Sequence, residues 1–268
     1  MYEILEKEKL AENIYSFKIK AEDIAKKAKA GNFIMLRINK QGERIPLTIA
    51  DHNNNSITLV VQVIGKTTQD LSKLNKGDKL LDLVGPLGNP SEMEQNKTVC
   101  LIAGGCGCAE VLPIAKEFKK NNNKVIVIFG ARSENLLFWE EEFKKISDEF
   151  IICTNDGSKG IKGFVTTALE ELINKQKIDL VLAVGPIPMM KAIADLTRDK
   201  VETKVSLNSI MVDGIGMCGS CRITVNNKIK FVCVDGPEFD AHQVDFEEIS
   251  KRNALYKQEE EHVCKLGV

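Results

Sequence analysis

Apolar and polar residues alternate in short runs over residues 1–95. The runs NIYSFKIKA, NFIMLRI, PLTIAD, SITLVVQVIG and KLLDLVG are broken by turn-forming residues, and most of them have no long helical stretch between them. Alternation with a period of two predicts half-buried strands, and a succession of short strands is typical of an antiparallel barrel or sandwich. We therefore expect an antiparallel β-barrel over residues 1–95.

From residue 96 to residue 208 an apolar run is repeatedly followed by an amphipathic helical pattern. The apolar runs are TVCLIAGG, KVIVIFGA, EFIICTND and IDLVLAVGP. Such a repeat predicts a parallel sheet covered by helices on both faces, and so a multi-domain protein of the β plus α/β class. Residues 209–268 contain too few apolar residues for a large core. We expect them to form a small module that depends on a metal centre or on packing against a neighbour.

The charge of the chain is close to balanced. Its 268 residues include 37 Lys and Arg against 38 Asp and Glu, for a net charge of −1. This balance argues against nucleic acid or an anionic membrane as the main partner. No stretch approaches the ~20 apolar residues of a membrane span, and the first residues, MYEILEKEKLAENIY, lack the apolar core of a signal peptide. The sequence therefore predicts a cytoplasmic protein.

Eight cysteines require an explanation, because cytosolic thiols rarely form structural disulfides. Cys100 and Cys153 lie in apolar runs and are expected to be small buried hydrophobic residues. Cys106 and Cys108 lie within a glycine-rich turn, where packing is favoured over a redox or regulatory thiol pair. Cys218, Cys221 and Cys233 lie further along the chain, at spacings that suit a metal.

Two glycine-bearing turns are expected at the carboxyl edge of the predicted parallel sheet. The first, from Gly104 through Gly105 to Gly107, follows a strand and precedes a helix. Glycines there allow the backbone to approach a pyrophosphate, although close packing of a helix on the sheet also requires glycine. The second turn consists of Gly185 and Pro186, with Met189 at the start of the next helix. Ligands of open parallel sheets bind at this edge.

Two further segments in the barrel region offer hydrogen-bond donors for phosphate oxygens. One is RIPLT, which contains Arg44, and the other is a GKTT turn that follows Gln62 and contains Gly65. Each segment alone is more often a turn with an exposed charge.

The run VDGIGMCGSC contains the pattern most typical of a metal site. Cys218 and Cys221 are two residues apart, and Cys233 is expected on a following strand. The spacing resembles a plant-type [2Fe–2S] loop in which Asp213 stands where the first thiolate would be. Zinc remains an alternative, with His242 or His262 as the added ligand, and so does the absence of any metal.

Taken in order, these motifs resemble the ferredoxin-NADP reductase superfamily, in the branch of dihydroorotate dehydrogenase electron-transfer subunits. Within that branch the chain is similar to the small subunits of NADH-dependent reduced ferredoxin:NADP oxidoreductases, which are also known as sulfide dehydrogenase subunits. The runs that carry the resemblance are RIPLT, GKTT, the turn at Gly104, GPIPMM, VDGIGMCGSC and CVDGPEFDAHQVDF. The last two runs are the specific ones, and the others occur in many flavin reductases.

The resemblance implies three cofactor sites. FAD is expected on the barrel, NAD(H) on the parallel-sheet domain and a [2Fe–2S] cluster on the third module. It also implies a heterodimer with a larger flavin and [4Fe–4S] subunit, through which ferredoxin and NADP(H) react in electron bifurcation. The FAD residues that the resemblance implies are Arg44, Pro46, Leu47, Thr48, Gly65, Thr67 and Thr68, and Gln62 before the GKTT turn is a further candidate. The candidates for the nucleotide come from the two glycine turns and from the loop after the third parallel strand, and are Gly104, Gly105, Gly107, Asp156, Gly157, Gly185, Pro186 and Met189. The candidates for the cluster come from the cysteine spacing and are Asp213, Cys218, Cys221 and Cys233.

We therefore interpret the chain as an oxidoreductase subunit that moves electrons between NAD(H) and its partner through FAD and one [2Fe–2S] cluster. Hydride transfer moves two electrons and the cluster accepts one, so flavin is needed between them. No catalytic acid or base is expected. The alternatives are the electron-transfer subunit of an NAD-dependent dihydroorotate dehydrogenase and a non-catalytic, zinc-stabilised nucleotide-binding regulator.

Two finer expectations concern specificity and docking. Asp156 follows the third parallel strand, where it can accept a hydrogen bond from a ribose hydroxyl and repel a 2′-phosphate, so NADH is expected in preference to NADPH. Arg132, at the end of the preceding strand, could oppose that preference. The tail from Asp235 to Val268, with acidic stretches at residues 245–248 and 259–261, is expected to dock the partner subunit, and a solvated charged helix is the alternative.

Overall fold

The computed structural model describes residues 1–255, and these fall into two compact units. Unit 1 contains Met1–Pro90, Asn208–Pro237 and the described residues from Asp245 onward, and unit 2 contains Ser91–Leu207 and Glu238–Val244. Within this described part, no helix is long and apolar enough to cross a membrane. Residues 256–268, with Glu259–Glu261, His262 and the last part of the tail expected to dock a partner, lie outside the described residues.

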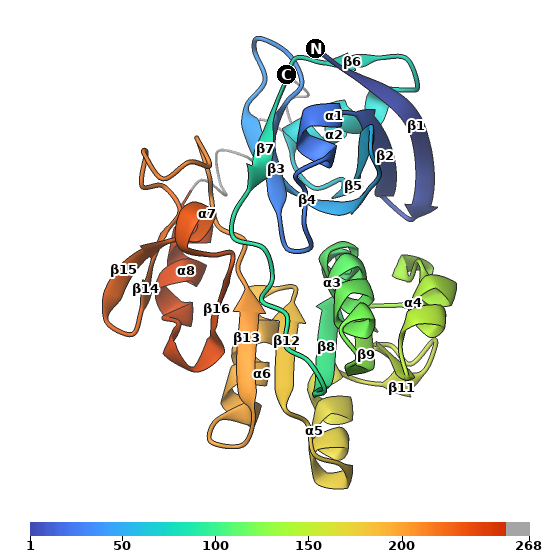
Figure 1. Ribbon diagram of the computed structural model, residues 1–268, viewed down its shortest axis with the longest axis vertical. Coiled ribbons are helices and arrows are strands. Elements are labelled where there is room, and N and C mark those ends of the chain that lie inside the picture. The colour runs from blue at the N-terminus through green and yellow to red at the C-terminus, as the bar shows by residue number, and fades with distance from the viewer. Residues whose placement is uncertain (256–268) are drawn as a thin grey trace. The chain divides into compact units, whose positions relative to one another are not determined.

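A seven-stranded antiparallel sheet forms the larger part of unit 1 (Figure 1). Its strand order is β6-β1-β2-β5-β4-β3-β7, and only Leu81 separates the two edge strands in the chain, so the sheet nearly closes on itself. Phe17, Ile34 and Leu59 are among the fully buried side chains inside it. The antiparallel barrel predicted from the sequence is confirmed. Its elements are β1 (Tyr2–Ala11), β2 (Ile14–Lys20), α1 (Glu22–Ala25), β3 (Phe33–Arg37), β4 (Arg44–His52), β5 (Ser56–Gln62), α2 (Lys66–Lys73), β6 (Lys79–Leu80) and β7 (Asp82–Leu87).

Strand β1 was not among the runs from which strands were predicted. Of its ten residues only Ile4 is buried, and Glu and Lys occupy most of the other positions. The strand forms because it pairs with β2 along almost its whole length and with β6 at its start. A strand held mainly by ladder hydrogen bonds leaves little hydrophobic pattern in the sequence.

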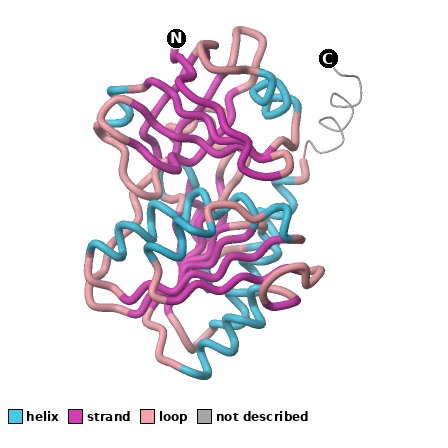
Figure 2. Tube along the Cα trace, turned by 90° about the vertical axis from the view of Figure 1, so that its right-hand side faces the viewer, coloured by secondary structure: helices cyan, strands magenta, loops and turns pink. Residues whose placement is uncertain are grey.

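Unit 2 is a seven-stranded sheet in the order β11-β10-β9-β8-β12-β13-β16, parallel except at β16. Helices α3 and α4 contact each other, as do α5 and α6, and helices lie on both faces of the sheet (Figure 2). The predicted parallel sheet is thus confirmed. Its elements are β8 (Thr98–Gly104), α3 (Cys108–Lys120), β9 (Lys124–Ala131), α4 (Glu140–Ile146), β10 (Glu149–Thr154), β11 (Ile161–Lys162), α5 (Val165–Lys175), β12 (Leu180–Val184), α6 (Ile187–Thr197), β13 (Glu202–Ser206) and β16 (Glu238–Asp240).

The strand order reverses between β8 and β12. The chain runs outward from β8 through β9 to β10, and then returns to place β12 on the other side of β8. The carboxyl ends of β8 and β12 therefore form the topological switch point at which sheets of this kind bind ligands. Both predicted glycine turns lie there.

The segment with the clustered cysteines belongs to unit 1. It contains a two-stranded hairpin and two helices, and the hairpin is held against α8 because Glu248 accepts the N–H of Thr224 at 2.7 Å. Asp245 begins α8 by accepting the N–H groups of Glu247 and Glu248. The elements are β14 (Arg222–Val225), β15 (Lys228–Phe231), α7 (Val232–Asp235) and α8 (Phe246–Asn253).

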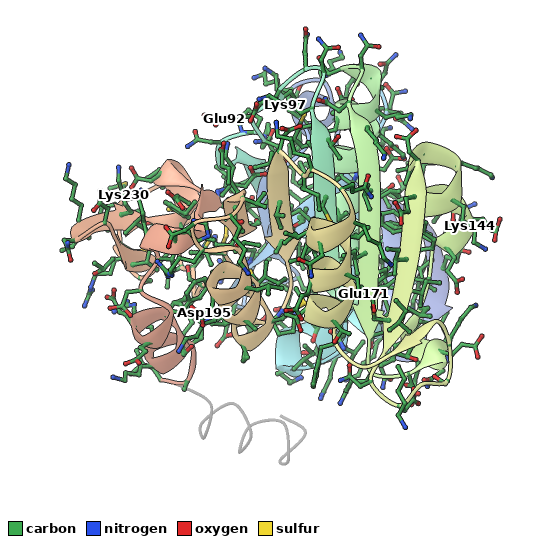
Figure 3. All side chains as sticks on the ribbon, turned by 90° about the horizontal axis from the view of Figure 1, so that it is seen from below. Glu92, Lys97, Lys144, Glu171, Asp195 and Lys230 are labelled. Carbon is green, nitrogen blue, oxygen red and sulfur yellow. The ribbon has the colours of Figure 1, made fainter. Side chains whose placement is uncertain are left out.

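Between α7 and α8 the chain enters unit 2 and adds β16 antiparallel to β13. This three-residue strand was not predicted, because it is too short to show a period. The hydroxyl of Ser91 donates a hydrogen bond to the carboxylate of Glu238 on β16. Next to it Lys204 pairs with the exposed Glu92 at 2.7 Å; Glu92 is labelled in Figure 3. The two places where the chain enters unit 2 are thus joined by side chains.

Glu238 gives a pH test of this junction. Burial raises its pKa, although the hydrogen bond from Ser91 and the charge of Lys204 oppose the shift. The folded state therefore holds the proton more tightly than the unfolded state, and the stability from Glu238 falls as the pH rises above the ordinary glutamate range of about 4.3. We expect the wild type to lose stability relative to Glu238→Gln between about pH 4 and neutrality. The measurement is urea unfolding followed by fluorescence of Trp139, the single tryptophan.

Glu92→Gln is the matched control. The hydrogen bond from Lys204 lowers the pKa of Glu92, so its contribution is present above the ordinary glutamate pKa and is lost as the pH falls. The stability of the wild type relative to Glu92→Gln should therefore increase as the pH rises. This is the opposite of the trend expected for Glu238→Gln. A difference between wild type and Glu238→Gln that stays constant with pH would contradict the assignment.

Candidate functional site

The two donor segments of the barrel lie at the same end of neighbouring strands. RIPLT forms the first half of β4, and GKTT begins α2 directly after β5. Because β4 and β5 run antiparallel, with Ile49 beside Leu59, the start of β4 lies beside the end of β5. Half-buried Gln62 ends β5. The structure thus brings together two segments that are well separated in the sequence.

Alternation along β4 divides the predicted FAD residues between two faces. Leu47 packs against the hydrophobic core of the barrel. Arg44, Pro46 and Thr48 alternate with it and share the other face. The guanidinium of Arg44 lies 3.4 Å from the carboxylate of Asp82, and both side chains are exposed. Arg44, Pro46 and Thr48 therefore share one face of β4, and Leu47 lies on the other.

The GKTT segment is the first turn of a helix, where the sequence had suggested a turn. The hydroxyl of Thr68 accepts the N–H groups of Ile64 at 2.9 Å and Gly65 at 3.0 Å, and so closes the start of α2. The side chain of Thr68 is thus engaged within the protein, and Thr67 beside it is half-buried. A Cβ on Gly65 would meet no atom within 4 Å, so the space at this helix start is open to an anion.

The glycine turns of unit 2 pack closely on each other. A Cβ on Gly104 would lie 2.6 Å from Sδ of Met189, and one on Gly185 would lie 3.0 Å from Cα of Gly104. A Cβ on Gly107 would collide with the carbonyl oxygen of Val184. These three glycines are therefore required by packing alone, which was the alternative explanation for the turn.

Gly105 differs from the other glycines of these turns. Its φ is +55°, in the left-handed region, and a Cβ there would meet nothing within 4 Å. It begins a single turn of 3-10 helix, Gly105–Gly107, that leads into α3. Open space beside a glycine backbone at the start of a long helix suits the approach of a pyrophosphate. Pro186, on the second turn, immediately precedes α6 and lies close to Gly104.

The loop after β10 lies beside the end of β9. The N–H of Asn155 bonds the carbonyl of Ala131 at 3.1 Å, and the N–H of Asp156 bonds that of Arg132 at 3.2 Å. The carboxylate of Asp156 accepts both the hydroxyl and the N–H of Ser158, which lower its pKa and keep it charged. Asp156 and Arg132 thus stand together at the carboxyl edge, as the sequence had suggested. Gly157, with φ of +80°, makes the turn that follows.

In the cysteine-containing loop, Asp213 organises the backbone. One of its carboxylate oxygens accepts the N–H of Ile215 at 2.9 Å and the other accepts that of Cys218 at 2.6 Å. Burial opposes the shift, but these hydrogen bonds lower the pKa of Asp213. Gly214, Gly216 and Gly219 all have positive φ and allow the loop to wrap. The carboxylate therefore already has the role of a turn cap.

The thiols form a close pair and a separate exposed member. Sγ of Cys221 lies 3.3 Å from Sγ of Cys233, and both residues are 2% exposed. Cys218 is exposed, and its Sγ accepts the N–H of Ser220 at 3.5 Å. The expectation that Cys233 lies on a strand is wrong. It lies in α7, a four-residue helix that begins directly after β15, because the chain turns sharply there toward Cys221.

The donor set fits a two-iron cluster better than a single ion. In the described residues, no three His, Cys, Asp or Glu side chains gather as the ligands of one ion would. The ligand candidates form two pairs, Cys221 with Cys233 and Asp213 with Cys218. Each iron of a [2Fe–2S] cluster takes two protein ligands, whereas a structural zinc ion takes four around one point. Burial, and then the neighbouring Cys221, raise the pKa of Cys233, so bound iron would be needed to hold the thiolate form.

Sequence reasoning missed two residues that position this loop. A Cβ on Gly214 would lie 2.6 Å from Cγ of Met35 on β3, so the loop contacts the barrel directly. Asn89 donates its N–H to Gly236 at 2.7 Å and its side-chain amide to the carbonyl of Val234 at 3.1 Å. Met35 and Asn89 are the two residues that were missed. Neither lies in a recognisable motif, because each acts through a contact between distant segments.

Three family models match successive parts of the chain. The oxidoreductase FAD-binding domain matches residues 2–91, and the oxidoreductase NAD-binding domain matches residues 101–195. The iron-sulfur cluster binding domain of dihydroorotate dehydrogenase B matches residues 208–245. The three cofactor types expected from the sequence are thus confirmed.

A Thermotoga maritima protein described as a dihydroorotate dehydrogenase B (NAD(+)) electron transfer subunit homolog is 48% identical over 261 residues. The match covers 96% of this chain and 92% of the relative. The chain belongs to this family of electron-transfer subunits. The dihydroorotate dehydrogenase B electron transfer subunit of Fusobacterium nucleatum, another relative, is 32% identical over 89% of this chain and 95% of its own length.

Solved structures agree with this family. A chain from the structure of an NADH-dependent reduced ferredoxin-NADP oxidoreductase, described for its insights into flavin-based electron bifurcation, superposes with a TM-score of 0.94 at 46% identity. The match covers 99% of this chain and 97% of that one. A ferredoxin NADP+ reductase from Neisseria gonorrhoeae, at 16% identity and a TM-score of 0.63 over 77% of this chain and 98% of its own, shares the fold. The chain is an oxidoreductase subunit of the ferredoxin reductase fold.

Gly107 provides a test of the packing at the switch point. Gly107→Ala forces a methyl group against the Val184 carbonyl, so we expect unit 2 to lose roughly 1–3 kcal/mol of stability. The measurement is urea unfolding followed by Trp139 fluorescence. Gly105→Asn is the control, because asparagine tolerates positive φ and faces open space, and it should leave the unfolding midpoint nearly unchanged. Equal losses from both substitutions would show that the close approach does not constrain the turn.

Proposed function

We propose that the chain carries electrons between NAD(H) and a larger partner subunit, through FAD in the barrel and a [2Fe–2S] cluster in the cysteine loop. One contact within unit 1 carries this proposal. Gly214 of the loop lies against Met35 on β3, and Met35 pairs with Pro46 on β4, where the predicted FAD residues lie. The predicted cluster loop thus lies beside the strand next to the predicted flavin strand. Short separations of this kind are what electron transfer requires.

In this proposal the barrel holds FAD by one face of β4 and the start of α2. Arg44 supplies charge for phosphate oxygens, Pro46 and Thr48 lie along the ring system, and Gly65 leaves room for the pyrophosphate. Thr67 and Gln62 border the same end of the barrel. Thr68 acts by closing the first turn of α2, and Leu47 by holding β4 against the core.

Unit 2 is proposed to hold NAD(H) at its switch point. Gly105 and the start of α3 receive the pyrophosphate, and Asp156 with Gly157 receive the adenosine ribose. Gly104, Gly185, Pro186 and Met189 shape this edge by packing against each other, and Gly107 does so by packing against Val184. Because the chemistry moves a hydride and single electrons, the chain's own residues orient the reactants and need no acid or base. When bound, FAD supplies the exchange between two-electron and one-electron transfer.

We further propose that three regions carry these roles: residues 1–95 for FAD, 96–208 for NAD(H), and 209–268 for the cluster and partner docking. The family models follow this order along the chain. A cytoplasmic location is part of the proposal. In its support, the described cysteines are all free thiols, as expected in a reducing compartment.

The partner is proposed to be the larger subunit of an NADH-dependent ferredoxin:NADP oxidoreductase, which would react with ferredoxin and NADP(H). The 46% identity to the electron-bifurcating structure supports this choice. The alternative, a dihydroorotate dehydrogenase partner, has weaker support, since relatives described without qualification as its electron transfer subunits are 32–34% identical. In either case, the similarity to proteins that are electron transfer subunits supports a larger catalytic partner.

Anaerobic purification from the native cell tests the proposal. We expect flavin and iron–sulfur absorption and co-purification of a larger flavin- and [4Fe–4S]-containing chain. Co-purification of a dihydroorotate-oxidising chain would select the alternative. A colourless zinc protein would overturn the redox function altogether.

Cofactor preference is tested with Asp156. Its charge should repel a 2′-phosphate, so reduction of an artificial acceptor is expected to be faster, in kcat/KM, with NADH than with NADPH. Asp156→Ala should lower the ratio of kcat/KM with NADH to kcat/KM with NADPH several-fold, by improving the use of NADPH. Asp156→Ala combined with Asn155→Arg should lower this ratio further. Arg132→Ala is the control for the opposing charge and should widen the ratio. A higher kcat/KM with NADPH in the wild type would refute the assignment.

Cluster ligation is tested with Asp213. Asp213→Cys should retain a cluster with an altered potential and EPR spectrum, because thiolate is a softer ligand than carboxylate. Cys221→Ala should lose the cluster. Glu247→Ala is the control, since Glu247 is an exposed carboxylate on α8, outside the cysteine loop, and its loss should leave the spectrum unchanged. An unchanged EPR spectrum in Asp213→Ala would show that Asp213 is a turn cap only.

A further inference from the structure

Unit 1 contains a cavity of about 250 Å³ beside the cysteine loop. Of the proposed cluster ligands only Cys218 reaches it, so the cavity is not the cluster site itself. The hairpin, α8 and the chain that leads into the loop form the remaining walls. The lining residues are Ser209, Ile210, Val212, Cys218, Gly219, Ser220, Arg222, Ile223, Ile249, Arg252, Asn253 and Leu255.

The charged residues that line this cavity are all basic. Arg222 and Arg252 line it, and no acidic residue does. Within residues 1–255 the guanidinium of Arg222 has no hydrogen bond or ion pair. Arg252 donates one hydrogen bond, to the carbonyl of Ser220 at 2.8 Å, and forms no ion pair in the same residues. By contrast Lys230, on the same hairpin as Arg222 and labelled in Figure 3, pairs with Asp235 at 3.2 Å.

The cavity also has an unused hydroxyl and an apolar wall. Ser209 is 6% exposed, and its hydroxyl has no hydrogen-bond partner among the described residues. Buried polar groups are rarely left in this state, because each costs about 1–3 kcal/mol. Two apolar residues that line the cavity, Val212 and Leu255, are 56% and 59% exposed. The cavity wall therefore contains both hydrogen-bond donors and apolar side-chain surface.

We propose that this cavity binds a small carboxylic acid with an apolar body. The guanidinium fork of Arg222 matches a carboxylate, with Arg252 and Ser209 as further donors. Val212 and Leu255 would cover the hydrocarbon part. A singly charged carboxylate fits this partly apolar site better than a phosphate dianion, because removing the second charge from water costs more.

Binding at this place would be coupled to the redox state of the proposed cluster, and this coupling rests on the proposed function. The cavity shares Cys218 with the cluster loop. Reduction adds one electron to the cluster, and the added charge repels a bound anion. By linkage, the acid binds the oxidised form more tightly and lowers the reduction potential by the same factor.

Direct binding is tested by calorimetry on the full chain with hexanoate as the probe and acetate as its short analogue. The expected result is saturable binding, with hexanoate at least tenfold tighter than acetate because its longer chain contacts Val212 and Leu255. Equal binding of the two acids, or none, would overturn the proposal. Binding that appears only after removal of residues 256–268 would assign the site to the chain's own carboxylates and would also overturn it.

Variants of Arg222 distinguish the effect of its positive charge on binding from a general effect on folding. Arg222→Ala should weaken hexanoate binding at least tenfold, and Arg222→Lys should restore part of it, since lysine keeps the charge but not the fork. Lys228→Ala, on the hairpin but outside the cavity lining, is the matched control and should bind as the wild type does. Arg252→Ala is less informative alone, because it also removes the hydrogen bond to Ser220. Equal binding by Arg222→Ala and the wild type would refute the site.

A redox titration of the cluster-loaded chain, followed by EPR, tests the coupling. Saturating hexanoate should lower the cluster potential, and a tenfold weaker affinity after reduction corresponds to a shift of about 59 mV. No shift should occur in Arg222→Ala. Absence of a cluster would defeat the proposed function and leave the calorimetric result standing. Calorimetric binding without a shift would refute the coupling alone.

Discussion

The close approach of the cysteine loop to the barrel is the contact on which the arrangement of unit 1 depends. Gly214 lies against Met35 so closely that no side chain fits there, and its φ of +74° suits glycine. Hydrogen bonds from Asn89 to the backbone around Gly236 hold the other end of the same segment. Together they seat a segment with little core of its own on a preformed sheet. The small cysteine module thus takes its rigidity from the barrel.

Glycine in this protein serves packing and ligand access at once. In unit 2 the turns at Gly104 and Gly185 touch each other, and Gly107 lies under the carbonyl of Val184. Close contact there keeps the ends of β8 and β12 in register at the switch point. Only Gly105 faces open space. The same sequence signal therefore reports two physical demands, and coordinates are needed to separate them.

The cysteine loop shows how ligands can be prepared before a cofactor binds. Asp213 holds the backbone N–H groups of Ile215 and Cys218, and Cys221 is held beside Cys233 by the turn into α7. Two pairs of donors suit two irons. The arginine-lined cavity on the far side of Cys218 adds a place where bound charge would act on the same loop.

Local pattern was sufficient for the barrel, the parallel sheet, both glycine turns and the metal-type spacing, because each leaves a periodic or short-range signal in the chain. Strand β1 and strand β16 left none, since one is largely polar and the other has three residues. The faces of β4, the engaged hydroxyl of Thr68 and the position of Cys233 on a helix also followed only from packing. The contacts of Met35 with Gly214 and of Ser91 with Glu238 join residues more than 140 positions apart. Such contacts depend on how whole elements meet, and tertiary structure alone decides that.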